Sequence, residues 1–342
     1  MSKIKCILLF CLKWTIILTL SVIGTVLLYF EYKEIPIYDF KLAYKFIKGE
    51  QNYTQYENIA QKLGYNKEDK LLIIHADDLG LSSSVNKASF KAFKDGSINS
   101  ASIMMTCEKL SEVSEFSKNN PDLDLGVHLT TTSEWKNYKW NGVLESSKIP
   151  TLINKNGNLY ENIKLVTLNA DATELKRELQ AQIDLAKSLG INISHIDSHE
   201  GALFFNKEFF KVYLELASEN KLAVFVPDIV TAQFDSSLIQ PENLVVIDNL
   251  YMAQNGMNLE DFESFYLNIL DNLEPGLSQI LVHLGYDDDE MKKITVDHPD
   301  FGSKWRLYDF NVISSDKFKK GLIKNNIKLV NWKDIQSVLY PN

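Results

Sequence analysis

Cysteine is scarce in this chain, with three residues in 342. Two of them, Cys6 and Cys11, lie in an apolar N-terminal segment, which leaves Cys107 alone in the rest of the sequence. So few cysteines exclude a disulfide framework and a cysteine-rich zinc site. We expect Cys107 to pack as a small apolar residue near the end of a strand.

The chain also has fewer basic than acidic residues. The 36 Lys and Arg residues face 45 Asp and Glu residues, for a net charge of -9. This balance offers no basic surface for nucleic acid, so we expect no nucleic-acid partner. The hydrophobic content of 45% is that of an ordinary globular protein, and 342 residues suffice for one large core.

Long apolar runs are absent except at the N-terminus, where residues 14–30 carry no charge. A helix of that length spans roughly 25 Å, close to the thickness of a bilayer core. No Ala-x-Ala cleavage pattern follows it. We therefore predict a single-pass membrane anchor over residues 1–34, with a cleaved signal peptide as the alternative. Lysines flank the run on both sides and do not fix its orientation, but a long domain behind one anchor favours an extracytoplasmic location.

Residues 35–69 are polar and compatible with a linker or helical lead-in, and residues 70–342 are predicted to form one domain. Asp171 with Glu174 predicts a capping box at the start of a helix that Gly190 ends, and Gly96 ends a helix over 83–95. Strands are predicted at 71–75, 98–105, 124–130, 193–197, 222–227, 244–248, 279–283 and 327–331.

This alternation of strands and helices predicts an α/β fold, a distorted (β/α) barrel with seven or eight parallel strands. The alternative is an open doubly wound sheet. Against it, the first strand is not followed by the Gly-x-Gly-x-x-Gly loop of a dinucleotide site.

Two adjacent aspartates, Asp77 and Asp78, follow the first apolar strand. Neighbouring carboxylates repel one another unless a cation or a shared proton separates their roles. Active sites of parallel α/β proteins lie at the carboxyl ends of the strands. Five of the six histidines stand beside similar strand ends, so we expect them near the aspartates: His75, His128, His195, His199 and His283.

One carboxylate and two imidazoles can bind a divalent metal ion and leave positions open for water and substrate. The second aspartate can then accept a proton from water, and a further histidine can protonate the leaving group. These parts suit hydrolysis of an amide or ester. The residues alone select His128 as a ligand and His283 as proton donor, but leave open the choice within the aspartate pair and between His195 and His199.

Four ordered motifs narrow the choice. The segments His75–Ser82, Gly126–Thr130, His195–His199 and Val282–Tyr286 resemble the YdjC-like family of carbohydrate deacetylases, including chitooligosaccharide deacetylases, with similarity from about Lys70 to Asp334.

The resemblance implies a distorted (β/α) barrel that removes acetyl groups from N-acetylated sugars or oligosaccharides with one divalent metal ion, Mg²⁺ or Zn²⁺. It implies Asp77 as the general base that activates water and His283 as the catalytic acid, with His195 and Asp197 orienting His199. The implied metal ligands are Asp78, His128 and His199.

Two departures from the family pattern concern substrate contacts. Glu200-Gly201-Ala202 replaces further histidines, and Leu284 replaces a proline.

The aromatic-rich stretch 131–170 is either a platform for sugar rings or a packed loop over the site. Segment 287–310 is expected to close over the site.

For Asn86 and Arg306 a structural hydrogen bond is the expected use.

Two other functions of the protein stay open. One is hydrolysis of another acyl or amide bond on a glycan, and the other is carbohydrate binding without catalysis.

Overall fold

The computed structural model describes residues 59–231 and 244–341, together with 13–15, 18, 19, 21 and 23–25. The chain divides into two units, Met1–Gln51 and Asn52–Asn342, and the second contains the sheet and the helices around it. The predicted anchor and linker lie largely outside the described residues. Within the described part, no helix has both the length and the apolarity needed to cross a membrane.

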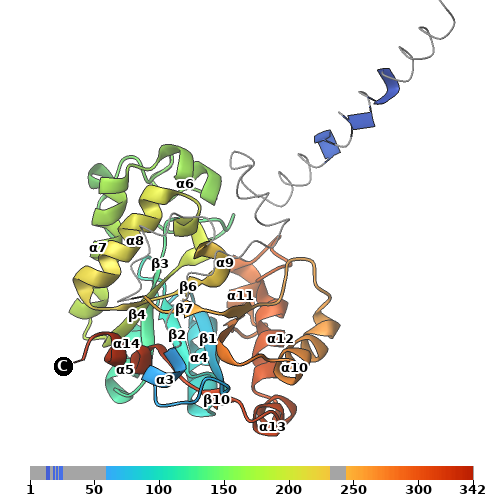
Figure 1. Cartoon of the computed structure of the whole chain (residues 1–342). Coiled ribbons are helices and arrows are strands. Elements are labelled where there is room, and N and C mark those ends of the chain that lie inside the picture. The colour runs from blue at the N-terminus through green and yellow to red at the C-terminus, as the bar shows by residue number, and fades with distance from the viewer. Residues whose placement is uncertain are drawn as a thin grey trace, which may run out of the picture. The chain divides into compact units, whose positions relative to one another are not determined.

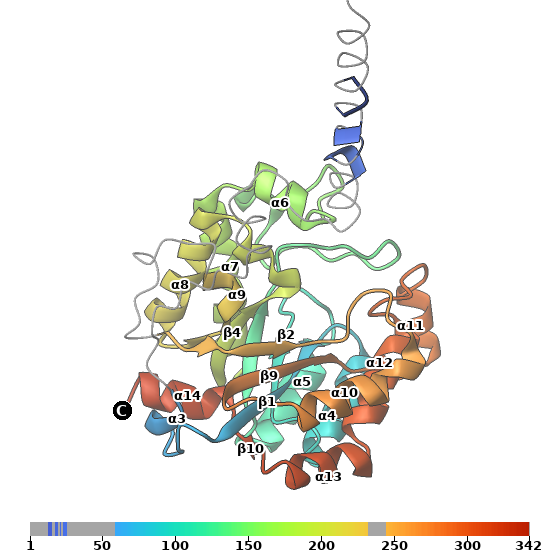
Figure 2. The same ribbon diagram turned by 45° about the vertical axis from the view of Figure 1, so that its right-hand side comes forward.

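The centre of the fold is a parallel sheet in the order β5-β4-β3-β2-β1-β9-β8, with β10 paired to the start of β1 (Figure 2). The strands are β1 (Lys70–Leu79), β2 (Ser100–Ile103), β3 (Leu125–Leu129), β4 (Ile193–Ser198), β5 (Ala223–Val224), β8 (Asn249–Tyr251), β9 (Gly276–His283) and β10 (Lys328–Leu329). Every pair in this sheet is parallel. The predicted α/β class and the predicted number of strands are confirmed.

The two edges of this sheet are connected. Only Phe225 separates β5 from β6 (Val226–Pro227), and only Asp248 separates β7 (Val246–Ile247) from β8. Because β6 pairs with β7, the two edge strands approach one another and the sheet curls. The expected barrel is therefore found as a curled, half-barrel-like sheet.

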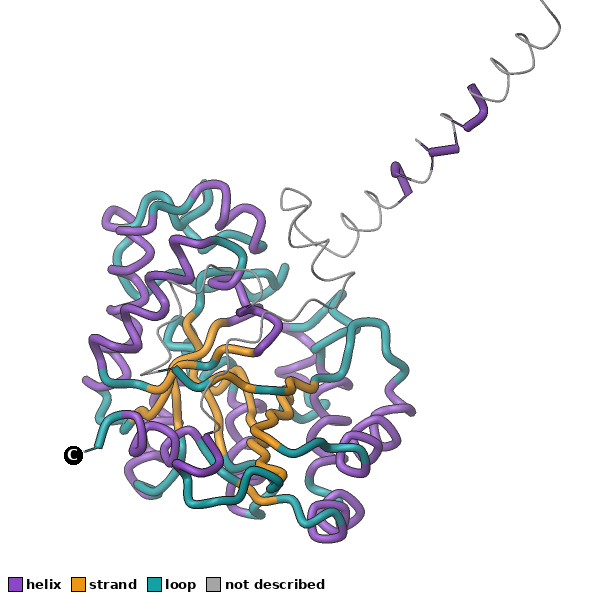
Figure 3. Tube along the Cα trace, in the orientation of Figure 1, coloured by secondary structure: helices purple, strands orange, loops and turns teal. Residues whose placement is uncertain are grey.

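Helices pack around the sheet and against one another (Figures 1 and 3). They are α3 (Ile59–Lys62), α4 (Ser83–Lys94), α5 (Leu110–Asn119), α6 (Ile163–Asn169), α7 (Ala172–Ser188), α8 (Lys207–Asn220), α9 (Asp228–Thr231), α10 (Phe262–Asp271), α11 (Asp289–Ile294), α12 (Ser303–Ile313), α13 (Asp316–Lys324) and α14 (Trp332–Leu339). Short 3-10 turns are η1 (Ser146–Lys148), η2 (His199–Phe204) and η5 (Leu259–Asp261).

The predicted helix ends are confirmed. Gly96 follows α4 with φ 65°, and Gly190 follows α7 with φ 75°, the left-handed conformation that glycine adopts readily. The predicted capping box is only half formed. Asp171 accepts bonds from the backbone of Thr173 and Glu174. Glu174, however, accepts bonds from the amide and hydroxyl of Thr151, a contact remote in sequence.

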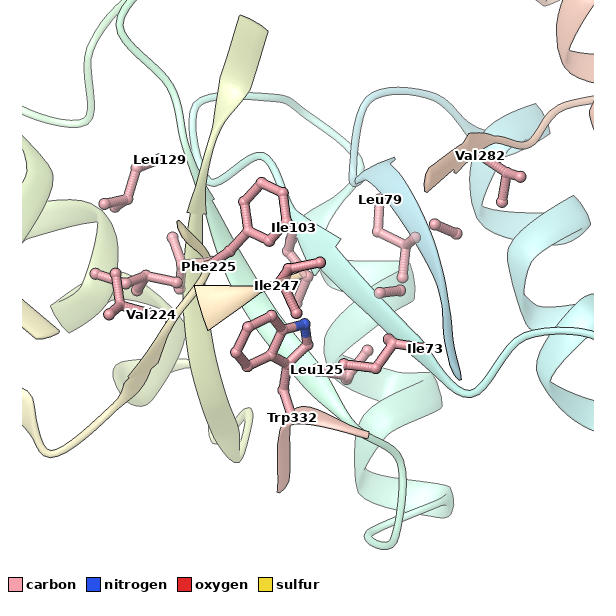
Figure 4. Packing of buried hydrophobic residues seen from close by; sticks show 14 of the residues in the cluster. Ile73, Leu79, Ile103, Leu125, Leu129, Val224, Phe225, Ile247, Val282 and Trp332 are labelled. Carbon is pink, nitrogen blue, oxygen red and sulfur yellow. The ribbon is translucent and has the colours of Figure 1, made fainter. Parts of the chain in front are cut away.

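Polar side chains occupy the inner face of the curled sheet together with the apolar core. Figure 4 shows Trp332 among the buried aliphatic residues. Its indole donates to Gln279 Oε1 over 3.0 Å and stacks on His195 at 5.6 Å between ring centroids. Residues two apart on a strand share a face. The inner face thus carries His75 and Asp77 on β1, Ser100 and Ser102 on β2, Gly126 and His128 on β3, and His195 and Asp197 on β4.

Gly126 makes room for His195 on this inner face. A Cβ at Gly126 would lie 2.4 Å from His195 Nε2. Since Trp332 and Ser194 hold the ring, it cannot withdraw. We predict that Gly126→Ala lowers the free energy of unfolding by about 1–3 kcal/mol. Urea unfolding measures this, and His195→Ala in the same chain should recover part of the loss. Equal stability of Gly126→Ala and the wild type would contradict the predicted clash.

Candidate active site

A bulge in β1 turns both aspartates toward the same space. Consecutive strand residues normally point to opposite faces. Here the pairing with β2 shifts between Ala76 and Leu79, and Asp78 has φ 70°. An inserted residue re-aims side chains in this way. As a result Asp77 Oδ2 lies 3.6 Å and Asp78 Oδ1 3.5 Å from the same atom, His128 Nε2.

The three residues implied as metal ligands meet at this point. Asp78 Oδ1 is 3.5 Å from His128 Nε2 and 3.7 Å from His199 Nδ1, and the two nitrogens are 3.1 Å apart. All three side chains are buried. They belong to the carboxyl ends of three parallel strands, β1, β3 and β4, which meet at one edge of the sheet.

The remaining polar atoms of these residues are already engaged, and this fits a cation at the centre. Asp78 Oδ1 is buried and has no hydrogen-bond partner among the described residues. Partners that hold a ligand's other atom fix its tautomer and direct the free lone pair inward. These partners are Arg306 Nη2 on Asp78 Oδ2 (2.7 Å), Asp197 Oδ1 on His128 Nδ1 (2.6 Å) and Glu134 Oε2 on His199 Nε2 (3.2 Å).

The expected supports of His199 were assigned wrongly. Asp197 lies against His128, and the carboxylate that contacts His199 belongs to Glu134 in the loop after β3. His195 lies deeper, 2.8 Å from Ser194 Oγ and stacked on Trp332. The sequence carried a weak signal for Glu134, an acid six residues after His128 among aromatic residues.

Arg306 belongs to the site more closely than expected. Its side chain is 1% exposed, donates to Asp78 and to the Phe301 carbonyl, and lies 5.4 Å from the Trp135 ring. Burial opposes ionisation of Asp78, but Arg306 and the neighbouring imidazoles hold the pKa of that carboxyl well below its usual range. Asn86 has the expected structural use, because it accepts from the Gly80 amide at 2.8 Å.

The implied base and acid are neighbours. His283 Nε2 lies 3.9 Å from Asp77 Oδ2. The His283 backbone amide donates to Asp309 on α12, and its ring contacts Phe301. Burial lowers the pKa of His283 to about 4, so its imidazole is neutral near pH 7 in the metal-free protein.

The aromatic residues of the loop over 131–170 pack against the fold and do not form an exposed platform. Trp135 and Trp140 are each 4% exposed, and Trp140 Nε1 donates to the Thr132 carbonyl at 2.6 Å. Trp140 also stands 6.2 Å from the His199 ring. The packed-loop interpretation is therefore confirmed. Segment 287–310 meets this loop, since His298 lies 6.0 Å from Trp135. Cys107 is buried as expected.

The fold and the site define the class of this protein. It is an α/β protein with a curled parallel sheet and a buried cluster of carboxylates and imidazoles at the carboxyl ends of the strands. Its donor set suits one divalent ion. The chain belongs to the YdjC-like protein family, whose model matches residues 71–324.

The similarity to known proteins extends over most of the chain. A carbohydrate deacetylase of Thermoanaerobacter pseudethanolicus is 28% identical over 265 residues, 77% of this chain and 98% of that protein. One from Thermus thermophilus is 26% identical over 293 residues, 83% of this chain and 100% of that protein. A crystal structure from Enterococcus faecalis, described as a candidate cellobiose-phosphate cleavage protein, matches with a TM-score of 0.65 and 22% identity. It covers 78% of this chain and 99% of that one, which shows the shared fold.

Proposed function

We propose that this protein is a metal-dependent carbohydrate deacetylase that removes acetyl groups from N-acetylated sugars or oligosaccharides. The observation that carries the proposal is the convergence of Asp78, His128 and His199 beside Oδ2 of Asp77, which lies 3.6 Å from His128 Nε2. The carbohydrate deacetylases among its relatives support the choice of substrate.

Asp78, His128 and His199 would hold the ion, and Mg²⁺ and Zn²⁺ are both candidates. A bound divalent ion would supply Lewis acidity toward the amide carbonyl and toward water. Asp77 would accept the proton of the attacking water through Oδ2, the oxygen that faces His128 and His283. Because His283 is neutral, it would take this proton from Asp77 before giving it to the departing amine nitrogen.

The turn after His199 contains Glu200-Gly201-Ala202, where the sequence is expected to differ from the family pattern. Glu200 and Gly201 both have positive φ, 53° and 66°. We propose that this turn and Leu284 bear on the choice of glycan.

The test is hydrolysis by the full-length chain of matched N-acetylated and O-acetylated mono- and oligosaccharides, with acetate and free amine quantified together. Equal amounts of acetate and amine are expected. Acetate without amine would indicate an ester substrate. Glycan binding without either product would indicate a carbohydrate-binding protein.

Proton release should accompany metal binding. Burial opposes a charge on His199, but Glu134 and Asp78 raise its pKa to about 10, so it is protonated near neutral pH without metal. A metal ion must displace that proton. Burial also opposes a charge on His128, but Asp77 and Asp197 raise its pKa. We therefore predict release of at least about one proton per ion and a metal affinity that rises with pH. Calorimetry in buffers of different ionisation enthalpy measures the release. A binding enthalpy independent of buffer would contradict it.

We also propose that residues 1–34 anchor the protein in a membrane as a single span with the domain outside the cytoplasm. The uncharged run over 14–30 supports this. Protease added to intact cells should digest the domain if the proposal holds and leave it intact if the domain is cytoplasmic.

A further inference from the structure

His75 has no role in the proposed reaction, yet it lies at the centre of the inner face of the sheet. The residue is fully buried. Its strand, β1, is separated from β4 by β2 and β3 in the sheet order. Nevertheless His75 Nε2 lies 3.0 Å from Asp197 Oδ2 on β4 and 3.2 Å from Asp77 Oδ1 on its own strand. The curl of the sheet brings these groups together.

The two carboxylates that share His75 act on different parts of the site. Asp197 uses its other oxygen, Oδ1, to hold His128 Nδ1 at 2.6 Å. Asp77 directs its other oxygen, Oδ2, toward His128 Nε2 and His283 Nε2. One imidazole therefore contacts both the proposed base and the carboxylate that orients a proposed metal ligand.

Asp77 Oδ1 is buried and has no hydrogen-bond partner among the described residues, and His75 Nε2 lies 3.2 Å from it as an ion-pair partner. Two serines of β2 hold the ring itself, with Ser100 Oγ 2.9 Å from Nδ1 and Ser102 Oγ 3.2 Å from Nε2. Although burial opposes the charged form, Asp197 and Asp77 raise the pKa of His75 to about 10. Without His75, the buried Asp77 Oδ1 would lose this cationic partner.

We infer that His75 is a positioning residue that fixes Asp77 relative to His128, so that the base and the metal site keep one geometry. This inference rests on the proposed function. Within the described part of the chain, the polar contacts of His75 go to Ser100, Ser102, Asp77 and Asp197, so it acts on the site through the two carboxylates.

The test compares His75→Leu, His75→Gln and the wild type in the full-length chain. Leucine fills space without a polar atom, whereas the glutamine amide can place a donor near the position of Nε2. We expect His75→Leu to lower kcat by about 100-fold with KM nearly unchanged, since a misplaced base loses much of its 10²- to 10⁴-fold contribution. Its Zn²⁺ affinity should fall by about tenfold, as for other residues that support a ligand indirectly. His75→Gln should recover at least about tenfold in kcat.

His195→Gln is the matched control, because it also replaces a buried histidine of the inner face, 5.2 Å away between ring centroids. A folded His75→Leu protein with the kcat of the wild type would overturn the inference. Equal losses in His75→Leu, His75→Gln and His195→Gln would also overturn it, because they would indicate general loosening of the inner face. If the wild type hydrolyses no substrate, the proposed function fails, and Zn²⁺ affinity then decides whether His75 supports His128.

Discussion

Asp77→Asn should lower kcat for deacetylation by about 10³-fold or more while the protein still binds its metal ion. The side chain is nearly isosteric, but an amide cannot accept the proton of the attacking water. None of the three proposed ligand atoms belongs to Asp77. Its Oδ2 lies 3.6 Å from His128 Nε2 and 3.9 Å from His283 Nε2. Rates measured at saturating substrate, with metal content determined on the same samples, give both quantities.

Asp122→Asn, the same change at an exposed aspartate, is the control and should behave as the wild type. The assignment of the base would be wrong if Asp77→Asn kept more than about a tenth of the wild-type kcat. Loss of metal from Asp77→Asn would instead mean that Asp77 is a ligand.

Asp78→Asn should have the second large effect, a loss of metal affinity of more than about 100-fold and with it the loss of turnover. The same change leaves the buried guanidinium of Arg306 without its anionic partner, which lies 2.7 Å away. Breaking one side of a buried ion pair costs about 3–5 kcal/mol, so the metal-free variant should also be less stable than the wild type.

Arg306→Leu combined with Asp78→Asn separates these two effects. Replacing both members of a buried pair removes the uncompensated charge. The double variant should therefore regain stability in urea unfolding and still fail to bind metal. Metal binding by either variant at wild-type affinity would contradict the role of Asp78 as a ligand.

The sequence allowed the strands and the principal site residues to be predicted because both leave local signals. Apolar runs of strand length ended in Asp and His, and parallel strands place such ends at one edge. The predicted range 71–75 falls short of β1 because Asp77 and Asp78 are expected directly after the strand, whereas they lie in the strand at its bulge. The bulge depends on pairing with β2 and has no local signature.

The supports of the ligands could not be predicted because they depend on contacts remote in sequence. Glu134 reaches His199 across 65 positions, and Arg306 reaches Asp78 across 228. Asp197 is close in sequence to His199, yet it pairs directly with His128 across β3 and β4, and its carboxylate contacts that imidazole instead. The family resemblance implied the right residue types here and the wrong partner for Asp197.

The most direct test of the proposed metal-dependent deacetylase is its activity as a function of bound metal. The full-length protein would be stripped with a chelator and titrated with Zn²⁺ or Mg²⁺, while acetate release from an N-acetylated oligosaccharide is followed. Activity should be absent from the stripped protein, rise in proportion to bound metal and reach its maximum at about one ion per chain, the capacity of a single site of this kind. Full activity in the stripped protein would contradict the account.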